Sequence, residues 1–130
     1  MPSFEPVFDH IHLRSLDPDK AATFYVDRLG AKVADRIETD KMLRVAIRIG
    51  TLDIFIDRVP DGTTPAAARP HRGLEHFGLK VDDLDTAVAD LKAHGVEFTM
   101  EPVEFRPGLR ISFIRGPDDV SIEILERKTV

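Results

Sequence analysis

The 130-residue sequence contains no cysteine, which excludes disulfides and thiol chemistry by this chain and fits a reducing compartment. It also has no block of like charges, and its net charge is −5. A nucleic-acid-binding surface is therefore not expected, because such a surface concentrates basic side chains. No apolar run approaches a membrane span, and no basic region followed by an apolar core marks a leader. We expect a soluble cytoplasmic protein that binds neither nucleic acid nor membrane.

What the sequence does contain is an internal repeat. In two places an acidic residue precedes a histidine, a pattern typical of a strand follows, and an aspartate stands seven residues after the histidine. The two histidines, His10 and His76, are 66 positions apart, and so are the two aspartates, Asp17 and Asp83. Each aspartate is placed to cap a helix. Two strand–helix units therefore carry one histidine each at the same place.

Each repeat predicts a strand, a helix and three further strands. The first half is expected to form strands over 7–15, 31–37, 43–49 and 52–57, with a helix over 18–29. The second half is expected to form strands over 74–81, 96–104, 109–115 and 120–126, with a helix from about residue 83 to the stop at Gly95.

A Pro/Gly/Thr/Ala-rich connection over 59–73 separates the halves, so we predict modules over about 7–58 and 74–127. One module of about 60 residues buries too little surface to stand alone. The two are therefore expected to join in one α+β domain over 1–130, with their sheets curving around a shared cleft.

Three side chains suit a divalent metal ion. His10 and His76 occupy matching strand positions, and Glu123 lies on the face of the last strand opposite the apolar side chains of Ile122 and Ile124. If the modules pair symmetrically, all three look into one cleft. Two imidazoles and one carboxylate suit Fe, Mn, Zn, Ni or Co and leave coordination positions open for substrate. A single strand histidine is more often an ordinary hydrogen-bonded residue, so the metal interpretation depends on the repeat.

Other polar residues fall on the same predicted strand faces. His12 shares a face with His10, and we interpret it as a cleft residue that binds substrate or moves a proton. Arg14 and Lys80 each lie four residues after a metal-candidate histidine, where they either bind an anionic substrate group or form surface ion pairs. The acids Asp9 and Glu75 are expected to point away from the cleft.

These residues make the chain resemble the vicinal oxygen chelate superfamily, which includes glyoxalase I, methylmalonyl-CoA epimerase, fosfomycin and bleomycin resistance proteins and extradiol dioxygenases. The resemblance covers nearly the whole chain. It is carried by Asp9-His10-Ile11 with Asp17, Phe24-Tyr25, Leu29-Gly30, Glu75-His76-Phe77-Gly78-Leu79 with Val81-Asp82-Asp83, and the segments 113–119 and 122–126. It implies two βαβββ modules around a metal cleft, a small-molecule substrate and usually a homodimer.

The resemblance also implies roles for particular residues. His10, His76 and Glu123 match three metal-ligand positions. Glyoxalase I and the epimerase have a fourth ligand in the last strand of the first module, where this chain has Phe55, which cannot ligate a metal. A register shift of two residues would offer Asp53 or Asp57 instead.

We therefore expect a metal-dependent lyase or isomerase of glyoxalase type. Glu123 would be a ligand and possible base, His12 the second acid–base group, Arg14 the partner of a substrate carboxylate, and Phe55 and Phe113 the apolar wall. Three alternatives stay open: an Fe(II)-dependent extradiol-type dioxygenase, an enzyme that adds a thiol or water as in fosfomycin resistance, and a non-catalytic binding or resistance protein.

Overall fold

The structure, a computed structural model, describes all of residues 1–130, and these form two compact units, Met1–Thr63 and Thr64–Val130. Both units have the order strand, helix, strand, strand, strand that the repeat predicts. The chain thus has two four-stranded mixed sheets and an α+β fold, as the sequence indicates. Neither of the two α-helices has the length and apolar character that crossing a membrane requires.

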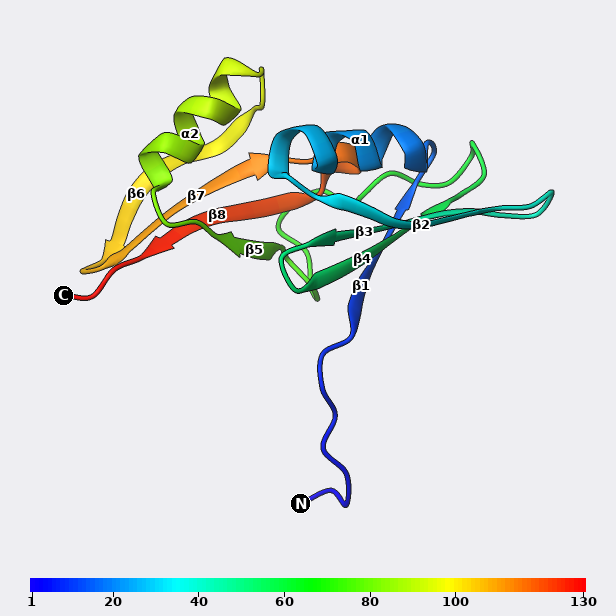
Figure 1. Cartoon of the computed structure of the whole chain (residues 1–130), viewed down its shortest axis with the longest axis horizontal. Coiled ribbons are helices and arrows are strands. Elements are labelled where there is room, and N and C mark those ends of the chain that lie inside the picture. Colours follow the sequence, from blue (N-terminus) through cyan, green and yellow to red (C-terminus); the bar gives the residue numbers. More distant parts are fainter. The chain divides into compact units, whose positions relative to one another are not determined.

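The first unit is a sheet with one helix against it (Figure 1). Its elements are β1 (His10–Ser15), α1 (Pro18–Leu29), β2 (Lys32–Glu38), β3 (Leu43–Ile49) and β4 (Leu52–Arg58). The strand order is β1-β4-β3-β2, with β1 parallel to β4 and the other neighbours antiparallel. Helix α1 packs on this sheet, so the opposite face is left to the residues of the candidate site.

Local sequence fixes both ends of α1. The carboxylate of Asp17 accepts a hydrogen bond from the backbone N–H of Lys20 at 3.1 Å, and Pro18 occupies the first turn. Gly30 ends the helix with φ of 72°, a left-handed conformation that glycine adopts at little cost. Between these ends the helix buries Ala21, Ala22 and Tyr25. They form the core with the apolar side chains of β3 and β4, namely Val45, Ile47, Ile54 and Ile56.

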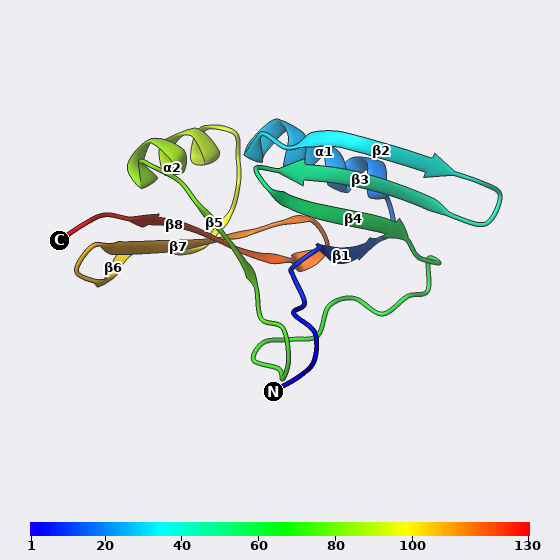
Figure 2. The ribbon, with the colours of Figure 1, turned by 60° about the horizontal axis from the view of Figure 1, so that its bottom comes forward.

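The second unit repeats this arrangement (Figure 2). Its elements are β5 (Phe77–Lys80), α2 (Leu84–Ala93), β6 (Phe98–Arg106), β7 (Leu109–Arg115), the short 3₁₀ turn Pro117–Asp119, and β8 (Ser121–Arg127). The strand order is β5-β8-β7-β6, and β5 is parallel to β8. Its buried core includes Leu84, Val88, Leu91, Ile114, Ile122 and Ile124.

Two of the predicted strands begin several residues before the strands that the structure contains. The first starts at His10 rather than residue 7, and the second covers only Phe77–Lys80 rather than 74–81. Strand pairing explains the difference, because β8 begins at Ser121 and the first pair of this ladder is Phe77 with Ile122. Leu74 therefore has no strand partner and is 80% exposed. As a result, His76 lies directly before its strand instead of within it.

Glu126 is a buried carboxylate that serves the fold. Its Oε1 accepts a hydrogen bond from the backbone N–H of Leu84, the first residue of α2, at 2.9 Å, and its side chain is only 6% exposed. We expect Glu126→Ala to lower the free energy of unfolding by about 1–3 kcal/mol, because a buried N–H loses its acceptor. Urea unfolding measures this, with Glu104→Ala on the exposed strand β6 as the control. A loss equal to that of the control would show that water replaces the carboxylate.

Candidate functional site

The second unit brings His76 and Glu123 together. Nε2 of His76 lies 2.9 Å from Oε1 of Glu123, and the two side chains are 29% and 17% exposed. Glu123 is placed here because β8 alternates, with Ile122 and Ile124 buried on its other face. The ring of Phe113, which is paired with Glu123 across β7 and β8, contacts His76 edge-on at 4.8 Å.

This pair has the donor chemistry and the spacing of a metal-binding pair. Two ligand atoms about 2.1 Å from one ion, and at right angles to each other, are themselves about 3 Å apart. The 2.9 Å between His76 and Glu123 agrees with that value. A direct hydrogen bond between the imidazole and the carboxylate has the same length, so the spacing fits a metal without requiring one.

The acids that precede the two histidines, which the sequence predicts to point away from the cleft, each contact the neighbouring histidine. Oδ2 of Asp9 lies 2.6 Å from Nδ1 of His10, and the carboxylate of Glu75 contacts Nδ1 of His76. Both acids precede the first residue of their strand, so strict alternation of side chains does not apply to them. Contact with the His76 imidazole holds the pKa of Glu75 below its usual value. In both units Nδ1 is engaged by a carboxylate, so Nε2 is the nitrogen available to a metal ion.

In the first unit, His10 stacks on Phe55, with ring centroids 4.4 Å apart. Strand register shows which position of the second unit Phe55 matches. In each unit we take the residue two positions after the histidine and find its partner on the neighbouring parallel strand. His12 pairs with Phe55 in the first unit, and Gly78 pairs with Glu123 in the second. Phe55 therefore occupies the position equivalent to Glu123, in the register that the sequence comparison assumed. Phenylalanine has no donor atom, so this position supplies no metal ligand.

Asp57, which a register shift would offer as a substitute ligand, contacts Arg44 and His12. Its carboxylate accepts hydrogen bonds from Nε of Arg44 at 2.7 Å and from the terminal nitrogen of the same guanidinium at 3.1 Å. Nε2 of His12 lies 3.0 Å from the same carboxylate. The hydrogen bond from Arg44 holds the pKa of Asp57 below its usual value, against the opposing effect of burial, and the neighbouring His12 adds to the lowering.

Sequence reasoning did not identify Arg44 as a site residue, although a signal for it was present. The turn at Gly50-Thr51 sets the register of β3 against β4, so that Ile49 faces Leu52 and Arg44 faces Asp57. Counting outward from that turn would have paired the two opposite charges. Arg14 and Lys80 are exposed on their strands and form no ion pair, so the surface ion-pair interpretation finds no support.

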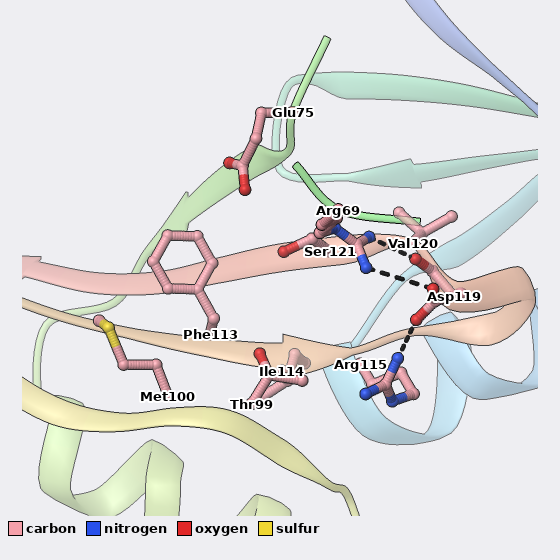
Figure 3. A pocket seen from close by; sticks show the side chains of 10 residues that line it. All are labelled: Arg69, Glu75, Thr99, Met100, Phe113, Ile114, Arg115, Asp119, Val120 and Ser121. Carbon is pink, nitrogen blue, oxygen red and sulfur yellow. Dashed lines mark hydrogen bonds and ion pairs between the residues drawn. The ribbon is translucent and has the colours of Figure 1, made fainter. Parts of the chain in front are cut away.

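A pocket of about 290 Å³ lies in the second unit (Figure 3). Glu75 and Phe113, which both contact His76, line it, and Ser121 lies two residues before Glu123 on the same face of β8. The other lining residues are Arg69, Thr99, Met100, Ile114, Arg115, Asp119 and Val120.

Charged side chains close one end of this pocket. Arg69, from the segment before β5, donates to the backbone oxygen of Asp119 at 2.6 Å and to its carboxylate at 3.2 Å. Arg115 contacts the same carboxylate. The pocket thus combines apolar surface from Phe113 and Met100 with a polar end of two guanidinium groups and one carboxylate, which suits a small polar organic molecule.

The predicted triad takes His10 from the first unit and His76 and Glu123 from the second. In neither unit do three or more His, Asp or Glu side chains gather as a group that could hold a metal. The structure therefore contains two parts of the predicted site, His10 with Asp9 and Phe55, and His76 with Glu75 and Glu123. The triad stays a prediction.

Comparisons with known proteins agree with this description. The profile of the Glyoxalase/Bleomycin resistance protein/Dioxygenase superfamily matches residues 7–124. The uncharacterized protein YwkD of Bacillus subtilis (strain 168) is 33% identical over 129 residues, which cover 91% of this chain and 94% of that protein. The probable chloroplastic lactoylglutathione lyase of Arabidopsis thaliana is 29% identical over 91% of this chain, which spans only 35% of that protein.

A solved structure shows the same fold. The glyoxylase/bleomycin resistance protein/dioxygenase domain from Frankia sp. EAN1pec has a TM-score of 0.78 and 25% identity, and the match covers 97% of this chain and 94% of that one. The chain has two βαβββ units with a histidine at the start of each, and the family profile matches residues 7–124. The chain belongs to the glyoxalase/bleomycin resistance protein/dioxygenase superfamily.

Proposed function

We propose that this protein is a metal-dependent lyase or isomerase of glyoxalase type, acting on a small substrate with two neighbouring oxygen atoms. The observation that carries the proposal is the His76–Glu123 pair, which has the donor types and the 2.9 Å spacing of two ligands of one ion. The equivalent His10, with its Nδ1 also held by an acid, supplies the third ligand. The similarity to a probable lactoylglutathione lyase supports this reaction class.

Each residue has a role in this proposal. His10, His76 and Glu123 would hold the ion, which supplies Lewis-acid stabilisation of an enolate-like oxygen. His12 accepts or returns the proton of a carbon next to the substrate carbonyl, while the electron pair moves onto the carbonyl oxygen. Phe55 and Phe113 exclude water, and the unpaired cations Arg14 and Lys80 attract an anionic group of the substrate. Two copies of the chain form a homodimer, which light scattering of the purified protein checks.

Activity with a defined probe tests this function. The protein is stripped with a chelator, reloaded in turn with Ni, Zn, Co, Mn or Fe, and mixed with the hemithioacetal of methylglyoxal and glutathione. Thioester formation that requires one of these ions supports the proposal. Oxygen consumption with a catechol and ferrous iron, in the absence of thioester formation, would replace it with the dioxygenase. Ligand binding that survives both the chelator and His76→Ala would point to a binding protein.

The acids behind the histidines give a separate prediction. If Asp9 and Glu75 hold the two imidazoles with Nε2 directed at the ion, the double variant Asp9→Ala/Glu75→Ala should bind metal about 10- to 100-fold more weakly. Competition with a chromophoric chelator measures the affinity. Asp82→Ala, which removes an exposed acid from the turn after β5, is the control. Affinities within about twofold of wild type would identify both acids as solvent-exposed charges without a role in metal binding.

A further inference from the structure

The first unit carries a charged cluster that the proposed metal site does not use. It consists of Arg44 on β3, Asp57 on β4 and His12 on β1, joined by hydrogen bonds of 2.7 and 3.1 Å from the guanidinium and by a 3.0 Å contact from Nε2 of His12. The three side chains are 32%, 23% and 38% exposed, so the cluster is partly desolvated. Its interactions are therefore stronger than those of fully exposed ion pairs.

The second unit shows that the fold does not require this cluster. In the strand register of the first unit, Asp57 lies opposite Arg14 on one side and Arg44 on the other. In the second unit, Leu125 lies opposite Lys80, the equivalent of Arg14, and opposite Ile111. Apolar side chains thus occupy the two positions in the second unit that Asp57 and Arg44 occupy in the first. His12 corresponds by the same registers to Gly78. A sheet of the same topology forms without any of the three groups, so their presence in the first unit calls for a different explanation.

The contacts set the orientation of the His12 ring. A neutral imidazole has one N–H and one nitrogen lone pair, and a carboxylate beside one nitrogen selects the tautomer that donates to it. Arg44 holds Asp57 through two hydrogen bonds and keeps its pKa below the usual value, so Asp57 is an ionised acceptor in a fixed position. Nδ1 of His12 has no hydrogen-bond partner, and the ring is partly exposed.

We propose that Asp57 and Arg44 are positioning residues for His12: Arg44 fixes the Asp57 carboxylate, which accepts the Nε2–H of His12 and leaves Nδ1 directed at a bound substrate. This inference rests on the proposed function for the role of His12, but the geometry itself does not depend on it. It also explains how the chain dispenses with a carboxylate at Phe55. The proton-transfer group lies on β1, directly paired with Phe55, instead of at the equivalent of Glu123.

The test replaces the cluster with the residues of the second unit, in the variant Arg44→Ile/Asp57→Leu. Proton–nitrogen correlation spectra of the histidine rings are recorded on the full-length protein without metal. In wild type we expect a slowly exchanging Nε2–H signal for His12, which the double variant loses. Arg48→Ile, which breaks a neighbouring ion pair between β3 and β4, is the matched control and should retain the signal. Loss of the signal in both variants, or retention in both, overturns the positioning role.

Kinetics separate this inference from the proposed function. With the hemithioacetal as probe, the double variant should retain its metal, and its KM should stay within about twofold of wild type. Its kcat should fall roughly 10- to 100-fold, because a misplaced His12 loses part of the rate enhancement that a general acid–base group provides. Unchanged kcat overturns the inference and leaves the lyase standing. If wild type does not turn over the probe, the lyase fails, and the spectra of the metal-free protein still decide whether Asp57 positions His12.

Discussion

Glu123→Ala should leave the purified protein without its transition metal. Wild type is expected to carry about one ion per chain, and the variant less than about 0.1, because the carboxylate is the only anionic member of the proposed ligand set. Elemental analysis after growth without added chelator measures both. Activity with any substrate should fall with the metal content. We expect this to be the largest functional effect of any single substitution in the chain.

The structural reason lies in the environment of Glu123. It is 17% exposed, lies 2.9 Å from Nε2 of His76, and is flanked on its strand by the buried Ile122 and Ile124. No other carboxylate of the second unit approaches Nε2 of this histidine, since Glu75 occupies Nδ1. Alanine at this position leaves two imidazoles, which bind a divalent ion far more weakly than the complete triad.

Two controls make the result decisive. Glu104→Ala removes an exposed carboxylate from β6 and should leave the metal content unchanged. A wild-type protein that stays empty when offered each of the five metals would contradict the proposal, and a binding protein would become the better account. Iron in the wild type would favour the dioxygenase, whereas nickel, zinc, cobalt or manganese would favour the lyase.

Ile54→Ala should destabilise the protein by about 3 kcal/mol, at the centre of the range for large-to-small core substitutions. Ile54 lies on β4 between β1 and β3, has no exposed surface, and belongs to the core that α1 covers. Alanine removes three carbon atoms from a closely packed layer, and the two strands that flank β4 prevent the cavity from closing. The midpoint of thermal unfolding should fall by about 10 °C.

A graded series tests the packing argument. Ile54→Val should cost about 1 kcal/mol, since it removes one carbon atom, and the exposed Phe105→Ala on β6 should stay within about 0.5 kcal/mol of wild type. Urea unfolding followed by circular dichroism gives all three values. If Ile54→Ala costs no more than Phe105→Ala, the core of the first unit is not packed as described.

Some features of the molecule follow from local rules, and these were predictable. The 66-residue spacing of His10 and His76 matched that of Asp17 and Asp83, and together with the matching order of predicted strands it indicated two copies of one βαβββ unit. Alternation of side chains placed Ile122 and Ile124 in the core and Glu123 on the other face. The resemblance of the motifs to the superfamily is confirmed by the family profile.

Other features depend on pairing between distant strands. The sequence could not show that β5 begins only at Phe77, because that limit is set by where β8 begins to pair. It could not show that Asp9 and Glu75 turn back onto their histidines, since both stand outside the strands where alternation applies. The contacts among Arg44, Asp57 and His12 join the strands β3, β4 and β1. Strand β1 is parallel to β4, and helix α1 lies between the two in the chain.

The sequence by itself thus determined the repeat, the order of elements, the buried faces and the family, because each depends on residues close together or at a fixed spacing in the chain. Tertiary structure decided which polar groups meet. The contacts of Glu123 with His76 and of Asp57 with His12 join residues 47 and 45 positions apart. Their formation depends on strand register to within one residue, because a slip of one position turns every side chain to the opposite face of the sheet.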